Sequence, residues 1–295
     1  MLKDCPGDYH MAGQVVSVLN MKGGVGKTTI SAHVMRVLYH HLGKKVLLLD
    51  LDPQFNLTQC LITRVEYEAL KKKHKTIFTA MEPPSNIGLF DVATTHHHPP
   101  APSTMIERLR HFKDGSAYLD LVSGNFELVK YSLIDDHHKL SAVQQRFLHF
   151  VSLARKEYDL IVIDCNPSSS FITLCALHAC SRLLVPVKPD RYSMLGLELV
   201  ADFLDRIPTI HPKPEITILL NGIPTQGYDP TTENELRAHK TFGTLVLSNK
   251  LRQSKLLLAS SDYTGFATDK PVPYKDLLRT EIRAIVTELA KRWKV

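Results

Sequence analysis

The stretch Val15–Thr29 constrains the fold more strongly than any other part of this chain. Apolar residues at 15–19 are followed at once by KGGVGKTT at 22–29, and a helical pattern then covers residues 30–42. A strand, a glycine loop and a helix in this order form a phosphate-binding loop, because backbone N–H groups and the positive end of the helix point at one anion. The general pattern has glycine where this chain has Met21, so the loop is a variant.

The polar residues of this loop match the chemistry of a nucleoside triphosphate, ATP in our prediction, bound together with Mg²⁺. Lys27 is predicted to reach the β- and γ-phosphates, and the Thr28 hydroxyl to contact the metal ion. A glycine turn between two core elements is the alternative, but the glycines, the lysine and the threonine are all correctly spaced after a strand. The residues predicted to bind the nucleotide here are Gly23, Gly24, Val25, Gly26, Lys27, Thr28 and Thr29.

A second lysine, Lys22, precedes the glycines, where an ordinary phosphate loop needs no cation. Either it is a solvated loop charge or it contacts a second phosphate. With this lysine the loop resembles that of the ParA/MinD family of deviant Walker ATPases, KGGxGKT, and is closest to ParA-type ATPases without an N-terminal helix-turn-helix domain. The resemblance implies a homodimer with ATP sandwiched between the subunits, in which Lys22 reaches the partner's nucleotide as a catalytic residue. It also implies that Gly23 lies where the two subunits press together.

Two further strands are predicted to end in carboxylates beside this loop. Residues 44–49 lead into Asp50 and Asp52 of a DLDPQ sequence, and the apolar run before Asp164 is typical of a Walker B strand. Ligands bind at the carboxyl ends of strands in open parallel sheets, so these acids are expected near the phosphates. Asp52 is the candidate for orienting the attacking water, and Asp50 and Asp164 are candidates for holding Mg²⁺. The alternative interpretation of the DLDP sequence is a capped turn.

Strands and helices alternate along most of the chain. Five to seven such strands predict an α/β fold with a doubly wound, mostly parallel sheet and helices on both faces, as in phosphate-loop NTPases. A late strand at 215–220 ends at Asn221, which matches the family position that hydrogen-bonds adenine. An Asn amide offers a donor and an acceptor, which suits a purine edge, although a strand-end turn explains it equally well.

The chain is predicted to form one ATPase domain over residues 14–295, preceded by a disordered lead at 1–13. The pattern weakens near 61–113, where we expect an irregular insertion. Within it, the run His96–Pro102 contains three histidines and three prolines and is expected to be an exposed loop. A metal site is the alternative, but no flanking cysteine or carboxylate completes a ligand set.

The net charge of +6 comes from the C-terminal part of the chain. Residues 237–295 carry twelve Lys and Arg against five Asp and Glu. Such an excess indicates a polyanionic partner, DNA or an anionic membrane, unless it is only a solvated face. The last helix, 274–294, has one apolar face and basic residues at its end, which favours core packing over membrane binding. The candidates for contacts to nonspecific DNA are Lys250, Arg252, Lys255, Lys270 and Lys275.

The five cysteines have no CxxC spacing, and no apolar stretch is long enough to span a membrane, which predicts a cytoplasmic protein with reduced thiols. Cys165 stands alone beside Asn166, where the resembled family has a proline, and is expected to be a buried thiol. The resemblance implies an ATPase that dimerises on Mg-ATP, associates with nucleoid DNA, and partitions plasmid or chromosomal DNA when a ParB-like partner stimulates hydrolysis. A MinD-like membrane-associated ATPase and a metal- or cluster-handling ATPase are the alternatives.

Overall fold

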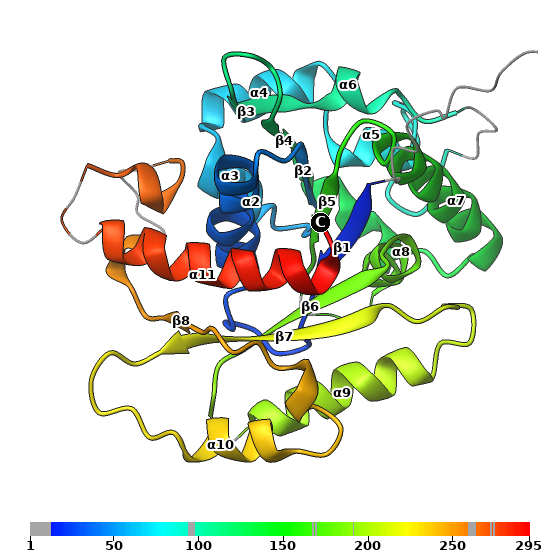
Figure 1. Ribbon diagram of the computed structural model, residues 1–295. Helices are drawn as coiled ribbons and strands as arrows, with labels where there is room; N and C mark the ends of the chain where they lie inside the picture. The colour runs from blue at the N-terminus through cyan, green and yellow to red at the C-terminus, as the bar shows by residue number, and fades with distance from the viewer. Residues whose placement is uncertain are drawn as a thin grey trace, which may run out of the picture.

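The computed structural model describes residues 13–295 except 94–97, 167, 169, 191, 259–263, 272 and 274. Its centre is a sheet of eight strands in the order β3-β4-β2-β5-β1-β6-β7-β8 (Figure 1). All neighbouring strands are parallel except β3, which runs antiparallel to β4. The strands are β1 (Gln14–Val18), β2 (Val46–Asp50), β3 (Glu107–His111), β4 (Tyr118–Val122), β5 (Leu160–Asp164), β6 (Arg182–Val187), β7 (Glu215–Ile223) and β8 (Leu251–Arg252).

Helices cover both faces of this sheet, which confirms the predicted fold class. The first helix after the glycine loop has three parts, α1 (Lys27–Thr29), the π-helical segment η1 (Ile30–Val34) and α2 (Met35–Leu42). The larger helices that follow are α3 (Asn56–Leu61), α4 (Arg64–Lys72), α5 (Ile77–Met81), α7 (His137–Ala154), α8 (Phe171–Ala179), α9 (Ser193–Asp205), α10 (Thr231–Ala238) and α11 (Lys275–Trp293). In Figure 1, α2 and α11 lie on one side of the sheet, and α7 and α8 lie on the other.

The central strands are apolar throughout because both faces of the sheet are covered. In β2, Leu47 and Leu49 belong to the core layer that contains α5, α7, α8 and α9, while Val46 and Leu48 belong to the layer with α2 and α11. All four side chains are fully buried, and they alternate between the two layers because successive residues of a strand point to opposite faces of the sheet. The sheet is therefore the common wall of two hydrophobic cores.

The order of the strands in the sheet determines where the candidate site lies. The chain leaves β1 for α1 and α2, and β1 lies between β5 and β6, so the direction of winding reverses at its carboxyl end. The parallel register aligns Val18 with Asp164 and Asp50 with Asp164. Two of the predicted acids are thus neighbours across adjacent strands, directly beside the loop that follows β1.

The segment near 61–113 is more regular than we expected. It contains α4, α5, the short helix α6 (Pro102–Met105) and the edge strand β3. Residues 94–97, which include His96 and His97, lie outside the described residues. His98 is described, and its ring lies against that of His149. Among the described residues no group of three or more His, Cys, Asp or Glu could hold a metal ion.

Both ends of the described chain are part of the fold. Residues 1–12 lie outside the described range, but Gly13 is buried and its N–H donates to the Arg155 carbonyl at 2.8 Å, so Gly13 belongs to the domain and not to a lead. At the other end, α11 packs its apolar face into the core, as predicted. The buried residues of α11 are Leu278, Ile282, Ile285, Val286, Leu289 and Trp293. None of the described helices is long and apolar enough to cross a membrane.

Candidate nucleotide-binding site

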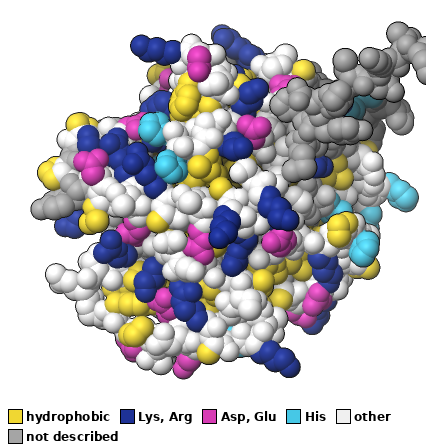
Figure 2. Space-filling view, viewed as in Figure 1, with side chains coloured by type: hydrophobic (Ala, Val, Ile, Leu, Met, Phe, Trp, Pro, Cys, Tyr) yellow, Lys and Arg dark blue, Asp and Glu magenta, His cyan; other side chains and the backbone are white. Residues whose placement is uncertain are grey.

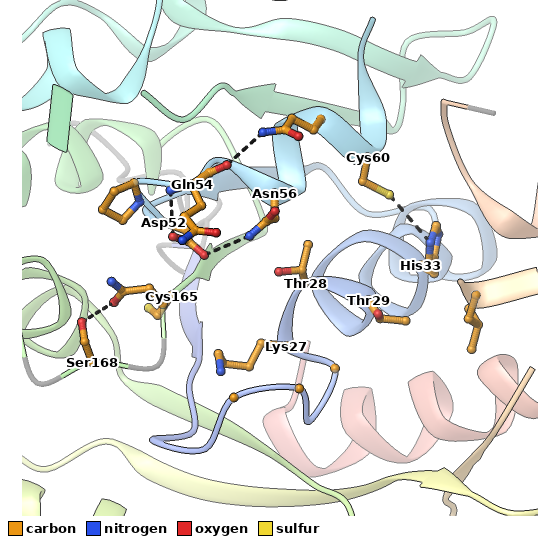
Figure 3. Close-up of a pocket in the computed structure, with 17 residues that line it drawn as sticks. Lys27, Thr28, Thr29, His33, Asp52, Gln54, Asn56, Cys60, Cys165 and Ser168 are labelled. Carbon is orange, nitrogen blue, oxygen red and sulfur yellow. Dashed lines mark hydrogen bonds between the residues drawn. The ribbon is translucent and has the colours of Figure 1, made fainter. Parts of the chain in front are cut away.

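A cavity of about 970 Å³ opens at the carboxyl ends of the central strands. Three loops line it (Figure 3): the glycine loop at 23–29, residues 52–56 after β2, and residues around Cys165 after β5. These segments come from distant parts of the sequence and meet because their strands are neighbours in the sheet. The volume is that of a site for a small-molecule ligand or cofactor.

The glycine loop has a backbone conformation that requires glycine at two positions. Gly24 has φ +73° and Gly26 has φ +91°, a region that other residues rarely adopt. A Cβ atom on Gly26 would also lie 2.1 Å from the Nδ2 atom of Asn221. Asn20 holds the start of the loop, because its amide donates to the Pro186 carbonyl at 2.8 Å and accepts the Lys22 N–H at 2.9 Å.

Lys27 is buried in this loop. Its Nζ atom donates to the carbonyl oxygens of Asn20 at 3.2 Å and Lys22 at 3.1 Å, so the ammonium lies over the loop (Figure 3). Burial lowers the pKa of Lys27, and Asp164 opposes that shift. A buried ammonium beside backbone N–H groups forms a site for a phosphate anion, which would compensate the cost of removing the charge from water.

The two acids at the strand ends are fully buried behind the loop. Asp164 accepts hydrogen bonds from the hydroxyl groups of Thr28, at 2.8 Å, and Ser31, at 2.7 Å. Asp50 accepts from the backbone N–H and the hydroxyl of Thr58, at 2.8 and 2.7 Å. Burial, followed by the repulsion of Asp164, raises the pKa of Asp50 to about 8. Burial also raises the pKa of Asp164 to about 6.

These groups fit a divalent cation. Besides burial, the charges of Asp164 and Asp52 raise the pKa of Asp50, and the charge of Asp52 raises the pKa of Asp164, while Lys27 is the cation that opposes the shift of Asp164. Mg²⁺ prefers such oxygen ligands and would neutralise their mutual repulsion. Thr28 lines the cavity, whereas Asp50 and Asp164 lie outside its lining, so Thr28 would meet the ion most directly and the two acids would support it.

Asp52 is the predicted acid that faces the cavity. Its side chain is 8% exposed and accepts hydrogen bonds from the Gln54 N–H at 2.9 Å and the Asn56 amide at 3.4 Å (Figure 3). These bonds fix the carboxylate toward the open space in front of Lys27. A carboxylate held in this way can orient a water molecule for attack on a phosphate.

Lys22 and Gly23 lie at the mouth of the cavity. The Lys22 ammonium forms an ion pair with Asp190 and lies 5.6 Å from the centre of the Tyr192 ring. Gly23 lines the cavity and is exposed, and, its chain neighbours aside, no atom of the described residues lies within 4 Å of the place where a Cβ atom would be. Lys22 itself is not part of the cavity lining.

Asn221 contacts the loop instead of the cavity. Its Nδ2 atom donates to the Val25 carbonyl at 2.7 Å, which holds the glycine loop against the end of β7. This hydrogen bond does not test the predicted contact between Asn221 and adenine, which stays a prediction.

Two of the DNA candidates form ion pairs with carboxylates within the chain. Lys250 forms an ion pair with Glu233 at 2.6 Å, and Arg252 forms one with Glu281 at 2.8 Å. All five candidates, which also include Lys255, Lys270 and Lys275, stay predictions.

The cavity lining includes a histidine that we did not predict. This residue is His33, in η1, and it is 5% exposed. Its Nδ1 atom accepts the Ala267 N–H at 3.2 Å, and its Nε2 atom lies 3.9 Å from the Cys60 sulfur (Figure 3). Burial, followed by the charge of Lys270, lowers the pKa of His33 to about 4. Its position four residues after Thr29, on the same helix face, was the available sequence signal.

Cys165 lines the cavity as a buried thiol, as predicted. Burial raises its pKa well above the ordinary value, and Asp164 adds to this shift. A thiol with a raised pKa is a poor metal ligand, because metals bind the thiolate.

The glycine loop, the buried lysine and the three carboxylates on a doubly wound sheet define a phosphate-loop NTPase. A family model described as an AAA domain matches residues 13–218. The chromosome-partitioning ATPase Soj of Thermus thermophilus is 30% identical over 79% of this chain and 81% of its own length. This chain belongs to the ParA/MinD family of deviant Walker ATPases.

Solved structures show the same fold. The pNOB8 ParA structure has a TM-score of 0.68 and 20% identity over 96% of this chain and 99% of its own. The same protein bound to nonspecific DNA has a TM-score of 0.64 and 19% identity over 96% and 99% of the two chains. A plasmid partition protein of Borrelia burgdorferi bound to AMPPNP has a TM-score of 0.63 and 18% identity over 93% and 98%.

Proposed function

We propose that this protein is a ParA-type ATPase that converts ATP to ADP and phosphate and partitions plasmid or chromosomal DNA. One observation carries the proposal: the glycines, Lys27 and Thr28 of the KGGVGKTT loop line a single cavity together with Asp52, and Asp50 and Asp164 lie buried behind them. The loop binds the triphosphate through its backbone N–H groups and Lys27. When bound, Mg²⁺ would neutralise charge on the phosphates and position them.

The three carboxylates have different roles in the proposed reaction. Asp164 orients the Thr28 hydroxyl through the 2.8 Å hydrogen bond, and Asp50 holds the α3 side of the site through Thr58. Asp52 alone of the three faces the cavity and orients the attacking water. Phosphoryl transfer depends on positioning and charge stabilisation. Because an isolated subunit lacks the Lys22 cation that a second copy would supply, we expect it to hydrolyse ATP slowly.

We place the dimer interface at the mouth of the cavity. Gly23 leaves open space there, and Lys22 lies beside it. Apolar side chains are exposed nearby on α9 and just before it, with Tyr192 48%, Leu195 53% and Leu199 49% exposed. Apolar groups exposed together indicate a surface that is buried in an assembly. In the homodimer, Lys22 leaves Asp190 and contacts the nucleotide of the partner subunit.

The DNA role rests on charge and on the relatives. The chain carries a net charge of +6, with the excess at its C-terminal end, and one structural relative is described as bound to nonspecific DNA. Phosphate contacts of this kind carry no base code. The ATP-bound dimer would therefore associate with nucleoid DNA in the cytoplasm, and a cargo-bound ParB-like partner would stimulate hydrolysis. The buried apolar face of α11 gives the membrane-associated alternative no support.

The test compares binding to DNA with binding to a lipid membrane. Protein loaded with a non-hydrolysable ATP analogue is mixed with random-sequence duplex DNA at two salt concentrations, and separately with anionic liposomes. A shift of the DNA that weakens as salt rises, without sedimentation of the protein with liposomes, supports the proposal. Liposome binding without DNA binding would refute it in favour of a MinD-like role.

A further inference from the structure

A second cavity, of about 180 Å³, opens between α2, α11 and the segment that precedes α11. It shares no lining residue with the nucleotide cavity. Figure 2 shows that Lys and Arg side chains gather on this face, near the N-terminal end of α11, beside acidic and histidine side chains. The cavity is lined by the charged residues Arg36, Asp269, Arg279 and Arg283 and by His40.

Arg36 is fixed in place before any ligand arrives. Its side chain is 8% exposed. One terminal nitrogen donates to the Thr268 hydroxyl at 2.9 Å, and the other forms an ion pair with Asp269. The guanidinium also lies 5.0 Å from the centre of the Phe266 ring. Its buried Nε atom has no hydrogen-bond partner among the described residues, and an unpaired buried donor is costly.

The surrounding charges leave a positive excess. Arg283 is exposed, and within the described part of the chain it has neither a hydrogen bond nor an ion pair. Arg279 donates to the Thr268 carbonyl at 2.7 Å and pairs with the largely exposed Asp276 at 3.2 Å. Asp269 is shared between Arg36 and Arg110. The carboxylates of Asp269 and Asp276 therefore balance only part of the positive charge of four arginines, which are Arg36, Arg110, Arg279 and Arg283.

The pKa of His40 is also affected by three of these arginines. Burial lowers its pKa, and the charges of Arg36, Arg283 and Arg279 lower it further. The ring therefore contributes a neutral polar edge to the cavity instead of another cation.

We propose that this cavity binds one phosphate group of the DNA backbone, an inference that rests on the proposed function. Guanidinium groups match phosphate oxygens in geometry and charge, and Arg36 is already oriented for them. At about 180 Å³ the cavity is smaller than the roughly 300 Å³ at which sites for whole ligands begin, so it fits a phosphate group and not a nucleoside. No base needs to enter it, so the contact is independent of sequence.

The contact joins residues that are distant in the sequence. Arg36 comes from the helix that starts at the phosphate loop, and Arg283 comes from the last helix. The same helix unit, α1–η1–α2, thus carries Thr28 in its first turn and Arg36 near its middle. One element would serve both nucleotide binding and DNA contact.

The test measures affinity for a random-sequence duplex against salt, with the full chain loaded with a non-hydrolysable ATP analogue. Arg283→Ala is the test variant, because this exposed side chain has no hydrogen bond or ion pair among the described residues. Arg206→Ala is the matched control, since Arg206 is 77% exposed at the end of α9. In Arg283→Ala we expect several-fold weaker binding and a salt slope smaller by about 1 for each engaged cavity. The control should match the wild type.

Each outcome is decisive. A wild-type protein that binds no DNA refutes the proposed function. A wild type that binds, with Arg283→Ala equal to it in affinity and slope, refutes this inference alone. Equal losses in Arg283→Ala and Arg206→Ala also refute it, because net charge would then explain both. If inorganic phosphate raises the melting temperature of the wild type but not of Arg283→Ala, while DNA affinity is the same in both, the ligand is free phosphate and the DNA assignment is wrong.

Discussion

The Nζ atom of Lys22 is paired with the carboxylate of Asp190 in its own chain, beside the ring of Tyr192. The lysine that distinguishes this loop from an ordinary phosphate loop is therefore held outside the nucleotide cavity of its own subunit. The two side chains are 32% and 38% exposed, so water screens the pair. The contact is a weak one that a partner subunit could replace.

Asp190→Asn is expected to strengthen the dimer. Releasing Lys22 removes a competing contact worth about 0–1 kcal/mol in each of the two subunits, so the dimer dissociation constant with a non-hydrolysable ATP analogue should fall by up to about 30-fold. Sedimentation velocity measures this. Lys22→Ala is the companion variant, which should bind nucleotide as a monomer and lose dimer-dependent hydrolysis. A weaker dimer in Asp190→Asn would show that Asp190 supports the interface directly.

Lys27→Ala should abolish nucleotide binding. The wild type, at a Mg-ATP concentration about 100 times the dissociation constant, gains roughly 2.7 kcal/mol of stability by mass action. The variant has lost the cation that lies over the loop, so its melting temperature should not respond to Mg-ATP. Lys291→Ala, an exposed lysine in α11, controls for the loss of a positive charge. A normal Mg-ATP response in Lys27→Ala would remove this lysine from phosphate binding.

Asp52→Ala should separate binding from hydrolysis. The side chain faces the cavity but makes only local hydrogen bonds, so ATP binding and dimerisation are expected to persist. Turnover should fall by at least about 100-fold, as for loss of a positioned catalytic carboxylate. Phosphate release under single-turnover conditions is the measurement, with the exposed Asp114→Ala as control. If the variant hydrolyses ATP at the wild-type rate, Asp52 is not part of the mechanism.

Asn221→Ala distinguishes two roles for one side chain. The structure shows its amide bonded to the Val25 carbonyl, which predicts equal losses of ATP and GTP affinity when the loop loses this support. The adenine contact implied by the family predicts instead that discrimination between ATP and GTP disappears. Isothermal titration with both nucleotides decides the matter. If the variant binds ATP and GTP with unchanged affinity, Asn221 has neither role.

His33 should make stability depend on pH. Its pKa is about 4 in the fold, below the ordinary value of 6.5, so the unfolded chain binds more protons between these values. The free energy of unfolding should therefore fall as pH falls, by about 2 kcal/mol between roughly pH 7 and pH 5. Urea denaturation of the wild type and His33→Gln measures the difference. Parallel pH profiles for the two proteins would contradict this prediction.

The local motif and the sheet could be predicted from the sequence. The glycine loop is continuous in sequence, and buried parallel strands are nearly pure Val, Ile and Leu, so their ends locate Asp50, Asp52 and Asp164. The edge strand β3 could not, because Glu107–His111 is partly exposed and lacks an apolar run. The contact between His33 and the Ala267 backbone spans 234 residues and has no local pattern.

Charge counting had a different weakness. A count along the sequence identifies the C-terminal cations but not their partners, which are Glu233 for Lys250 and Glu281 for Arg252. It also assigns Arg36 to the N-terminal part, although the fold brings this residue against α11. A basic site is a property of the surface, and only the tertiary structure joins its parts.

The two edges of the sheet also govern how copies of this chain can associate. β3 presents charged residues, with Arg108 paired to Asp120, and β8 is only two residues long. Neither edge offers a long row of free N–H and C=O groups, so strand-to-strand addition and aggregation are disfavoured. Many copies could therefore crowd along a polymer and remain separate, meeting only through side-chain surfaces that a ligand can open or close.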